Sequence, residues 1–186
     1  MVSSTTAAPR AVPNDLRLTV FDRLPATYVE APAGTDLDGP LSLSGTATAV
    51  DDQETATQEA ILRQYGFRSA YQRGWVVRGT GETLIIRVQL MGSPSQALGY
   101  FNLLNFGAQA SGQLTTFPTP ELAAASGFTR SFAESTGPQV AQDISLVRGP
   151  LFYHLIFTGP RGSISPADIL TIAGSQSTEA ASLGFA

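Results

Sequence analysis

Alternating apolar and polar residues near the middle of the chain predict a β-hairpin. In each of its two strands the apolar residues share one parity: Phe67, Tyr71, Trp75 and Val77 in the first, then Leu84, Ile86, Val88 and Leu90 in the second. A four-residue loop at 79–82 pairs Val77 with Leu84 and Trp75 with Ile86, which places both apolar sets on one face of the sheet. Hydrophobic pattern and register therefore agree, as a hairpin requires.

A second alternating pattern predicts three consecutive strands, over residues 128–134, 140–148 and 151–158. A three-residue loop between the first two strands places Phe132 opposite Val140 and Phe128 opposite Ile144. A tight turn at 149–150 joins the second strand to the third and brings their apolar residues to the same face. Both patterns are typical of antiparallel strands with one face in the core.

Helix-start signals accompany these strands. Ser-Pro pairs at 93–94 and 165–166 place a capping Ser before a Pro at the first helical position. They predict helices that run to about residues 109 and 181. Two Asp residues at 51–52 cap a third helix, which Gly66 ends.

Together these elements predict an α+β domain, in which an antiparallel sheet of about five to six strands has helices packed mainly on one face. Residues 16–21, which also alternate, supply the sixth strand. Strands followed by a Ser-Pro-capped helix occur twice, after Gly-Phe at 66–67 and at 127–128. An internal α-β-β-α pseudo-repeat and two independent uses of common caps both fit this order. Residues 1–15 predict a flexible linker before a single domain of residues 16–186.

Composition narrows the classes of function. Only 14% of the 186 residues are charged, the net charge is −4, and all 11 basic residues are Arg. Without a basic cluster, binding to a phosphate backbone lacks its electrostatic driving force, so no nucleic-acid partner is expected. The chain has no Cys, and Asp36 and Asp38 offer too few oxygens for a calcium loop. No Gly-rich loop leads from a strand into a helix, so we expect neither a metal nor a cofactor.

A long stretch of the chain, residues 88–120, contains no Asp, Glu, Lys, Arg or His. Its helix carries one apolar stripe that can cover a sheet and a second, flanking stripe of Tyr100, Leu103 and Phe106. The second stripe is buried either by the loop that follows, which contains Phe117, or by another protein. Tyr100, Leu103, Phe106 and Phe117 are therefore candidate partner-binding residues. Polar residues interrupt the stretch too often for a membrane span.

Two arginines are candidate ligand-binding residues. Arg73 and Arg130 share the parity of their apolar neighbours, so regular strands point both side chains toward the covered face. A buried Arg is costly unless it is paired, so each is expected to meet a carboxylate, either internal or from a ligand. A β-bulge at Gly74, or Arg stems that run to the sheet edge, would instead leave both side chains in solvent.

The only histidine lies near a serine and an aspartate in the predicted sheet. His154 is opposite Ser145 and diagonal to Asp143, an arrangement that suggests a hydrolase. We reject this interpretation because no nucleophile elbow precedes Ser145 and a flat strand offers no oxyanion hole. The three residues lie on the face away from Ile144, where polar side chains belong.

Two segments carry a resemblance to a known group of proteins. Tyr65-Gly-Phe-Arg-Ser-Ala-Tyr-Gln-Arg-Gly-Trp75 with its hairpin, and Ser95-Gln-Ala-Leu-Gly-Tyr-Phe101, resemble small α/β domains of actinobacterial exported proteins and lipoproteins, of the LpqN or Mog1/PsbP-like type. The resemblance spans residues 16–181. It implies a domain that binds partners or apolar ligands in the cell envelope or extracellular space, with no catalytic set to transfer. The sequence shows no signal h-region and no lipid-anchor Cys.

The sequence thus predicts a non-enzymatic binding domain of the cell envelope or extracellular space. Its first expected partner is another protein or a second copy of itself, bound through residues 88–120. The alternative is a carrier that holds an apolar or acidic-headed small ligand between sheet and helices, with Arg73 or Arg130 at the acidic end. A hydrolase that uses Ser145, His154 and Asp143 is the third hypothesis.

Overall fold

The computed structural model describes residues 13–111, 114–134 and 137–185. Its strands are β1 (Tyr28–Glu30), β2 (Gly39–Leu41), β3 (Ser69–Val77), β4 (Thr83–Leu90), β5 (Thr115–Phe117), β6 (Ala125–Glu134), β7 (Gly137–Arg148) and β8 (Leu151–Pro160). Its helices are the 3-10 helix η1 (Leu16–Thr19) and the α-helices α1 (Leu43–Val50), α2 (Thr55–Gln64), α3 (Pro94–Ser111) and α4 (Pro166–Ser182). Most of the predicted linker at 1–15 lies outside the described residues.

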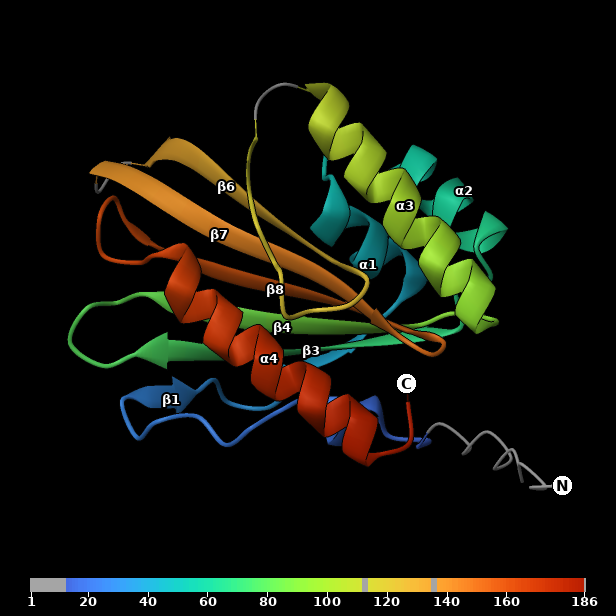
Figure 1. Ribbon diagram of the computed structural model, residues 1–186, viewed down its shortest axis with the longest axis horizontal. Helices are drawn as coiled ribbons and strands as arrows, with labels where there is room; N and C mark the ends of the chain where they lie inside the picture. Colours follow the sequence, from blue (N-terminus) through green and yellow to red (C-terminus); the bar gives the residue numbers. More distant parts are fainter. Residues whose placement is uncertain (1–12, 112–113, 135–136, 186) are drawn as a thin grey trace, which may run out of the picture.

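The strands form one antiparallel sheet in the order β1-β3-β4-β8-β7-β6-β5, and β2 pairs with β3 beside β1 (Figure 1). The α+β class and the antiparallel sheet are confirmed. The sheet has eight strands rather than five to six, because β1, β2 and β5 have three residues each and are too short to show alternation. Residues 16–21 are not a strand: the Asp15 side chain accepts from the Arg17 amide at 2.9 Å and starts η1.

Strand register agrees with the prediction in one hairpin and keeps its parity in another. Leu146 pairs with Tyr153 across β7 and β8, as the turn at 149–150 requires. In the β3–β4 hairpin Trp75 pairs with Leu84, two residues away from the predicted register. An even shift leaves every side chain on the expected face.

The β6–β7 register differs from the prediction by one residue. Phe128 lies opposite Asp143 rather than Ile144, and Glu134 pairs with Gly137. The predicted three-residue loop includes residues 135 and 136, which lie outside the described residues. Because the side-chain period of a strand is two, this odd shift turns Phe128 and Arg130 to the face of the sheet opposite Ile144.

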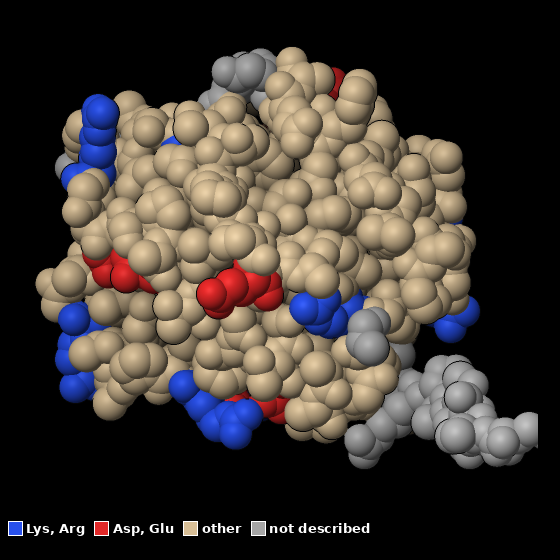
Figure 2. All heavy atoms as spheres, viewed as in Figure 1, with Lys and Arg blue, Asp and Glu red and all other residues tan. Residues whose placement is uncertain are grey.

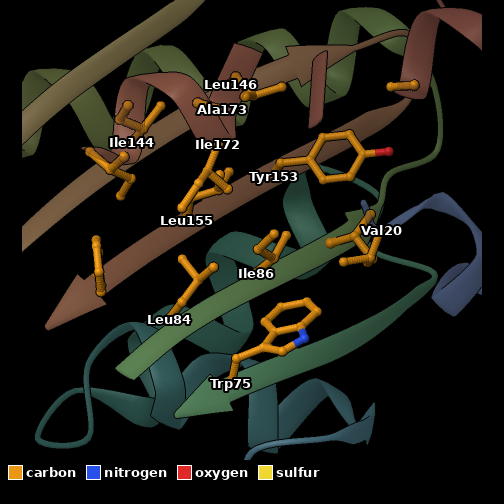
Figure 3. Close-up of a cluster of buried hydrophobic side chains, with 14 of the residues drawn as sticks. Val20, Trp75, Leu84, Ile86, Ile144, Leu146, Tyr153, Leu155, Ile172 and Ala173 are labelled. Carbon is orange, nitrogen blue, oxygen red and sulfur yellow. The ribbon is translucent and has the colours of Figure 1, made fainter. Parts of the chain in front are cut away.

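Each face of the sheet has its own apolar core. The first is shown in Figure 3, where Ile86, Tyr153 and Leu155 lie beside Ile172 and Ala173 of α4. The second joins Met91, Val147 and Phe152 to buried residues of α1, α2 and α3. Figure 1 accordingly shows α1, α2 and α3 gathered together, with α4 apart from them. Burial of each large apolar side chain contributes about 1.5–3 kcal/mol.

The helix caps are those that the sequence predicts for α3 and α4. The Gln96 amide donates to Ser93 Oγ at 3.2 Å, and the Ser165 amide donates to the Asp168 carboxylate at 2.8 Å. The third predicted helix corresponds to α2, which is shorter than predicted. The sequence analysis missed α1, whose N-terminus is capped by Ser42 Oγ accepting from the Gly45 amide. A hairpin followed by a helix does occur in both halves, but α3 and α4 lie on opposite faces; the duplication stays a prediction.

Candidate functional site

A cavity of about 280 Å³ lies between α1, α3 and the sheet. We call it the α3 cavity. Its polar lining residues are Gln89, Asn105, Arg130, Asp143, Ser145 and His154, and its apolar walls include Leu104, Ala108, Leu114, Phe128, Phe152 and Ile156. The lining therefore comes from α1, α3, the four strands β4, β6, β7 and β8, and Leu114 just before β5.

Strand alternation explains why polar side chains meet here. On β7 and β8, Ile144 and Leu155 point into the first core, so the intervening Asp143, Ser145 and His154 point the other way. In an open sheet that second face would be solvated. In this protein α3 covers it, and Asp143 and Ser145 are buried.

Arg130 and Asp143 form the charged part of the lining. Arg130 Nε donates to Asp143 Oδ2 at 3.1 Å, while the rest of the Arg130 side chain is half-exposed beside the Phe132 ring. Burial raises the pKa of the Asp143 carboxyl, and the charges of Arg130 and Arg87 oppose that effect. Among the described residues the terminal nitrogens of Arg130 have no hydrogen-bond partner.

His154 is uncharged at neutral pH. Burial, together with the positive charges of Arg87 and Arg130, lowers its pKa to about 3. Its Nε2 lies 3.7 Å from Asp143 Oδ1, which is longer than a hydrogen bond. The accessible quarter of its side chain faces the α3 cavity.

Arg87, which the sequence analysis did not single out, lies next to this cluster. It pairs across the sheet with His154 and is buried on the α3 side. Its guanidinium donates to Gln72 Oε1 at 2.8 Å and 3.1 Å, and to the Ala49 carbonyl oxygen at 3.1 Å. Within the described parts of the chain no carboxylate comes within ion-pair distance of it. Burial lowers its pKa to about 10, so it stays protonated among neutral acceptors.

Several buried polar atoms around the cavity lack hydrogen-bond partners among the described residues. They include both amide atoms of Gln89, Asp143 Oδ1 and the Tyr100 hydroxyl. Burial raises the pKa of Tyr100 to about 12; the Gln89 amide lies close enough to offset part of this effect, but the two groups do not meet in good hydrogen-bond geometry. Each buried polar group without a hydrogen-bond partner lowers the stability of the folded state by about 1–3 kcal/mol.

The structure brings Ser145, His154 and Asp143 together without the contacts of a catalytic triad. Ser145 lies opposite His154, but no hydrogen bond joins their side chains among those that the structure describes. His154 faces Asp143 with Nε2, the atom that a triad needs for its serine. No three His, Asp or Glu side chains of the described chain gather as a metal site would require.

Arg73 lies on the face of the sheet opposite the cavity and is already paired. Its guanidinium meets Glu30 Oε1 at 2.7 Å and Asp22 at 3.4 Å, and it stacks over the Trp75 ring. It lies on a covered face, as regular strands would place it, and both of its carboxylate partners are internal. Of the two candidate arginines, Arg130 alone lines the α3 cavity.

The predicted partner-binding residues separate into buried and exposed groups. Tyr100 is not on the surface, since its ring lies 5.9 Å from that of Tyr65 and 5.1 Å from that of Phe152. Phe117 packs over Gly127 in the β5–β6 pair. Leu103 and Phe106 are exposed by 37% and 74%, and Figure 2 shows hardly any charge over α3.

Comparison with known proteins identifies the fold alone. No family model matches the chain, and no curated protein matches it. Among solved structures, the extracellular domain of PknH from Mycobacterium tuberculosis superposes with a TM-score of 0.51, covering 94% of this chain and 100% of that chain at 8% identity. Among the described helices, none has the length and apolar content needed to cross a membrane.

Proposed function

We propose that this chain is a non-enzymatic binding domain that holds a small ligand in the α3 cavity. One observation carries the proposal: the polar side chains of Arg130, Ser145 and His154 converge on a cavity whose other walls are apolar. Apolar walls with a few converging polar groups are typical of small-molecule sites.

The proposal includes a location in the cell envelope or extracellular space. The resemblance of residues 65–75 and 95–101 to the LpqN or Mog1/PsbP-like domains of actinobacterial exported proteins supports it. The fold shared with an extracellular domain of a mycobacterial protein supports it as well.

Occupancy of the cavity can be tested with a neutral probe. We expect octanamide to shift the backbone amide NMR signals of Gln89 and His154, because both residues line the α3 cavity. Ala108→Phe fills the cavity from α3 and should abolish these shifts, whereas Ala110→Phe, an exposed position on the same helix, should leave them intact. Equal shifts in both variants, or shifts confined to the outer surface, would show that the ligand binds elsewhere.

The outer face of α3 favours a second candidate function, docking of another protein or of a second copy. Leu98, Leu103 and Phe106 are exposed on it, and the neighbouring sequence carries no charge that would repel an apolar partner. Light scattering on the wild type and on Leu103→Arg tests it. A wild-type dimer that forms with rising concentration and is lost in Leu103→Arg supports docking. If both proteins are monomers, self-association is ruled out.

A further inference from the structure

We infer that the α3 cavity selects a ligand with a single carboxylate on a short apolar body. This inference rests on the proposed function and adds the chemical class of the ligand.

The charges around the cavity do not balance. Arg87 and Arg130 are both positive, Asp143 supplies one negative charge, and His154 is neutral. The cluster therefore carries a net positive charge at the wall of the cavity, where Arg87 and Asp143 are buried and about half of the Arg130 side chain is exposed. Coulomb interactions are stronger there than in water. The electrostatic contribution to the binding free energy is therefore favourable for an anion and unfavourable for a cation.

The geometry points to a carboxylate at Arg130. Among the described residues, Asp143 engages only Nε of its guanidinium, which leaves the two terminal nitrogens available to a carboxylate. The Ser145 side chain lies on the same lining and provides a neutral hydroxyl for the second oxygen. Leu104, Phe152 and Ile156 form the apolar wall that would contact the body of the ligand.

Charge and size set limits on this ligand. One negative charge compensates the surplus, whereas a dianionic phosphate would leave a buried negative charge uncompensated. The volume of about 280 Å³ is near the lower end of ligand pockets, which are roughly 300–1,000 Å³. It therefore favours a short-chain acid over a lipid with two acyl chains.

Three probes of equal length separate charge from shape: octanoate, octanamide and octylamine, titrated by NMR against the full chain at one pH and ionic strength. We expect octanoate to bind about tenfold or more tightly than octanamide, as a charge-assisted hydrogen bond implies, and octylamine to bind weakest. Arg130→Gln should remove the advantage of octanoate without changing octanamide affinity. Arg130→Lys should restore part of it, and the exposed control Arg78→Gln should change neither.

The outcomes distinguish this inference from the proposed function. If octanamide or octylamine binds as tightly as octanoate, the carboxylate preference is wrong while the cavity still binds ligands. If Arg130→Gln weakens octanamide as much as octanoate, Arg130 shapes the cavity and does not recognise charge. If none of the three probes shifts the signals of the cavity residues, the proposed function is overturned and the inference falls with it.

Discussion

Arg130 Nε and Asp143 Oδ2 meet at 3.1 Å and join β6 to β7 at the α3 cavity. The two partners differ in environment, because Asp143 is buried while nearly half of the Arg130 side chain is exposed. Desolvation acts mainly on the carboxylate, and its pKa is raised in spite of the neighbouring cation. The attraction between the two groups therefore offsets only part of the desolvation free energy of the Asp143 carboxylate.

Asp143→Asn should consequently leave the protein as stable as the wild type at pH 7, or more stable by up to about 1 kcal/mol. A raised folded-state pKa means that the ionised carboxylate opposes folding, so stability falls as pH rises through that pKa. Urea unfolding at pH 7 measures the difference, with exposed Asp52→Asn as the control. A loss well beyond 1 kcal/mol would contradict this account of the pair.

His154→Gln tests a pH effect of the opposite sign. The folded-state pKa of His154 is lowered to about 3, so the unfolded chain binds a proton that the folded chain does not. This contribution to stability is complete above the ordinary histidine pKa and is lost as pH falls from about 6.5 toward 3.

The wild type should therefore lose stability relative to His154→Gln by about 1.4 kcal/mol per pH unit within this window. Urea unfolding between pH 7 and pH 4 gives the difference directly, because the two proteins share every other titrating group and differ only at the single histidine. Parallel curves for the two proteins would mean that His154 titrates normally in the folded state.

Arg87→Met should destabilise the fold by about 1–3 kcal/mol, because it leaves the Gln72 and Ala49 oxygens buried without their donor. Replacing Gln72 by Met as well should recover part of the loss, since one stranded acceptor is then removed. A double-mutant cycle in urea gives the coupling energy. Simple additivity of the two substitutions would exclude the Arg87–Gln72 interaction as a source of stability.

Gly127→Ala and Gly107→Ala should have opposite effects. A Cβ at residue 127 would lie 2.3 Å from the Phe117 ring, so we expect β5 to be displaced at a cost of about 1–3 kcal/mol. At residue 107, on α3, a Cβ meets nothing within 4 Å, and Ala should stabilise the helix by about 0.5–1 kcal/mol. Thermal unfolding of both variants checks the pair; a neutral Gly127→Ala would show that Phe117 moves freely.

The sequence predicted the long strands and the capped helices because their signals are local. Alternation marks strands of eight or more residues, and Ser-Pro pairs mark the starts of α3 and α4. The three-residue strands carry too little pattern to be found. Which face each helix covers is a tertiary property, so the sequence could not show that α4 lies on one face and α3 on the other.

The candidate site was harder to predict because a shift of one residue in the β6–β7 register changes which face of the sheet Arg130 lies on. The assumed β6–β7 loop put Arg130 beside Ile144, whereas the true register puts it beside Asp143. Arg87 and Gln89 were overlooked because an open sheet would leave their face in solvent. Their signal was indirect: polar side chains on a central strand that leads directly into a helix without charge.

The position of β8 between β4 and β7 has a consequence for how the chain acquires its structure. The last described strand occupies the middle of the sheet, so β4 and β7 are joined by backbone hydrogen bonds only through β8. Such long-range pairing is slow and leaves edges open to association with other chains. A nascent chain that stops before residue 151 therefore has two unjoined β-ribbons, and the sheet is completed only after residues 151–160 have been made.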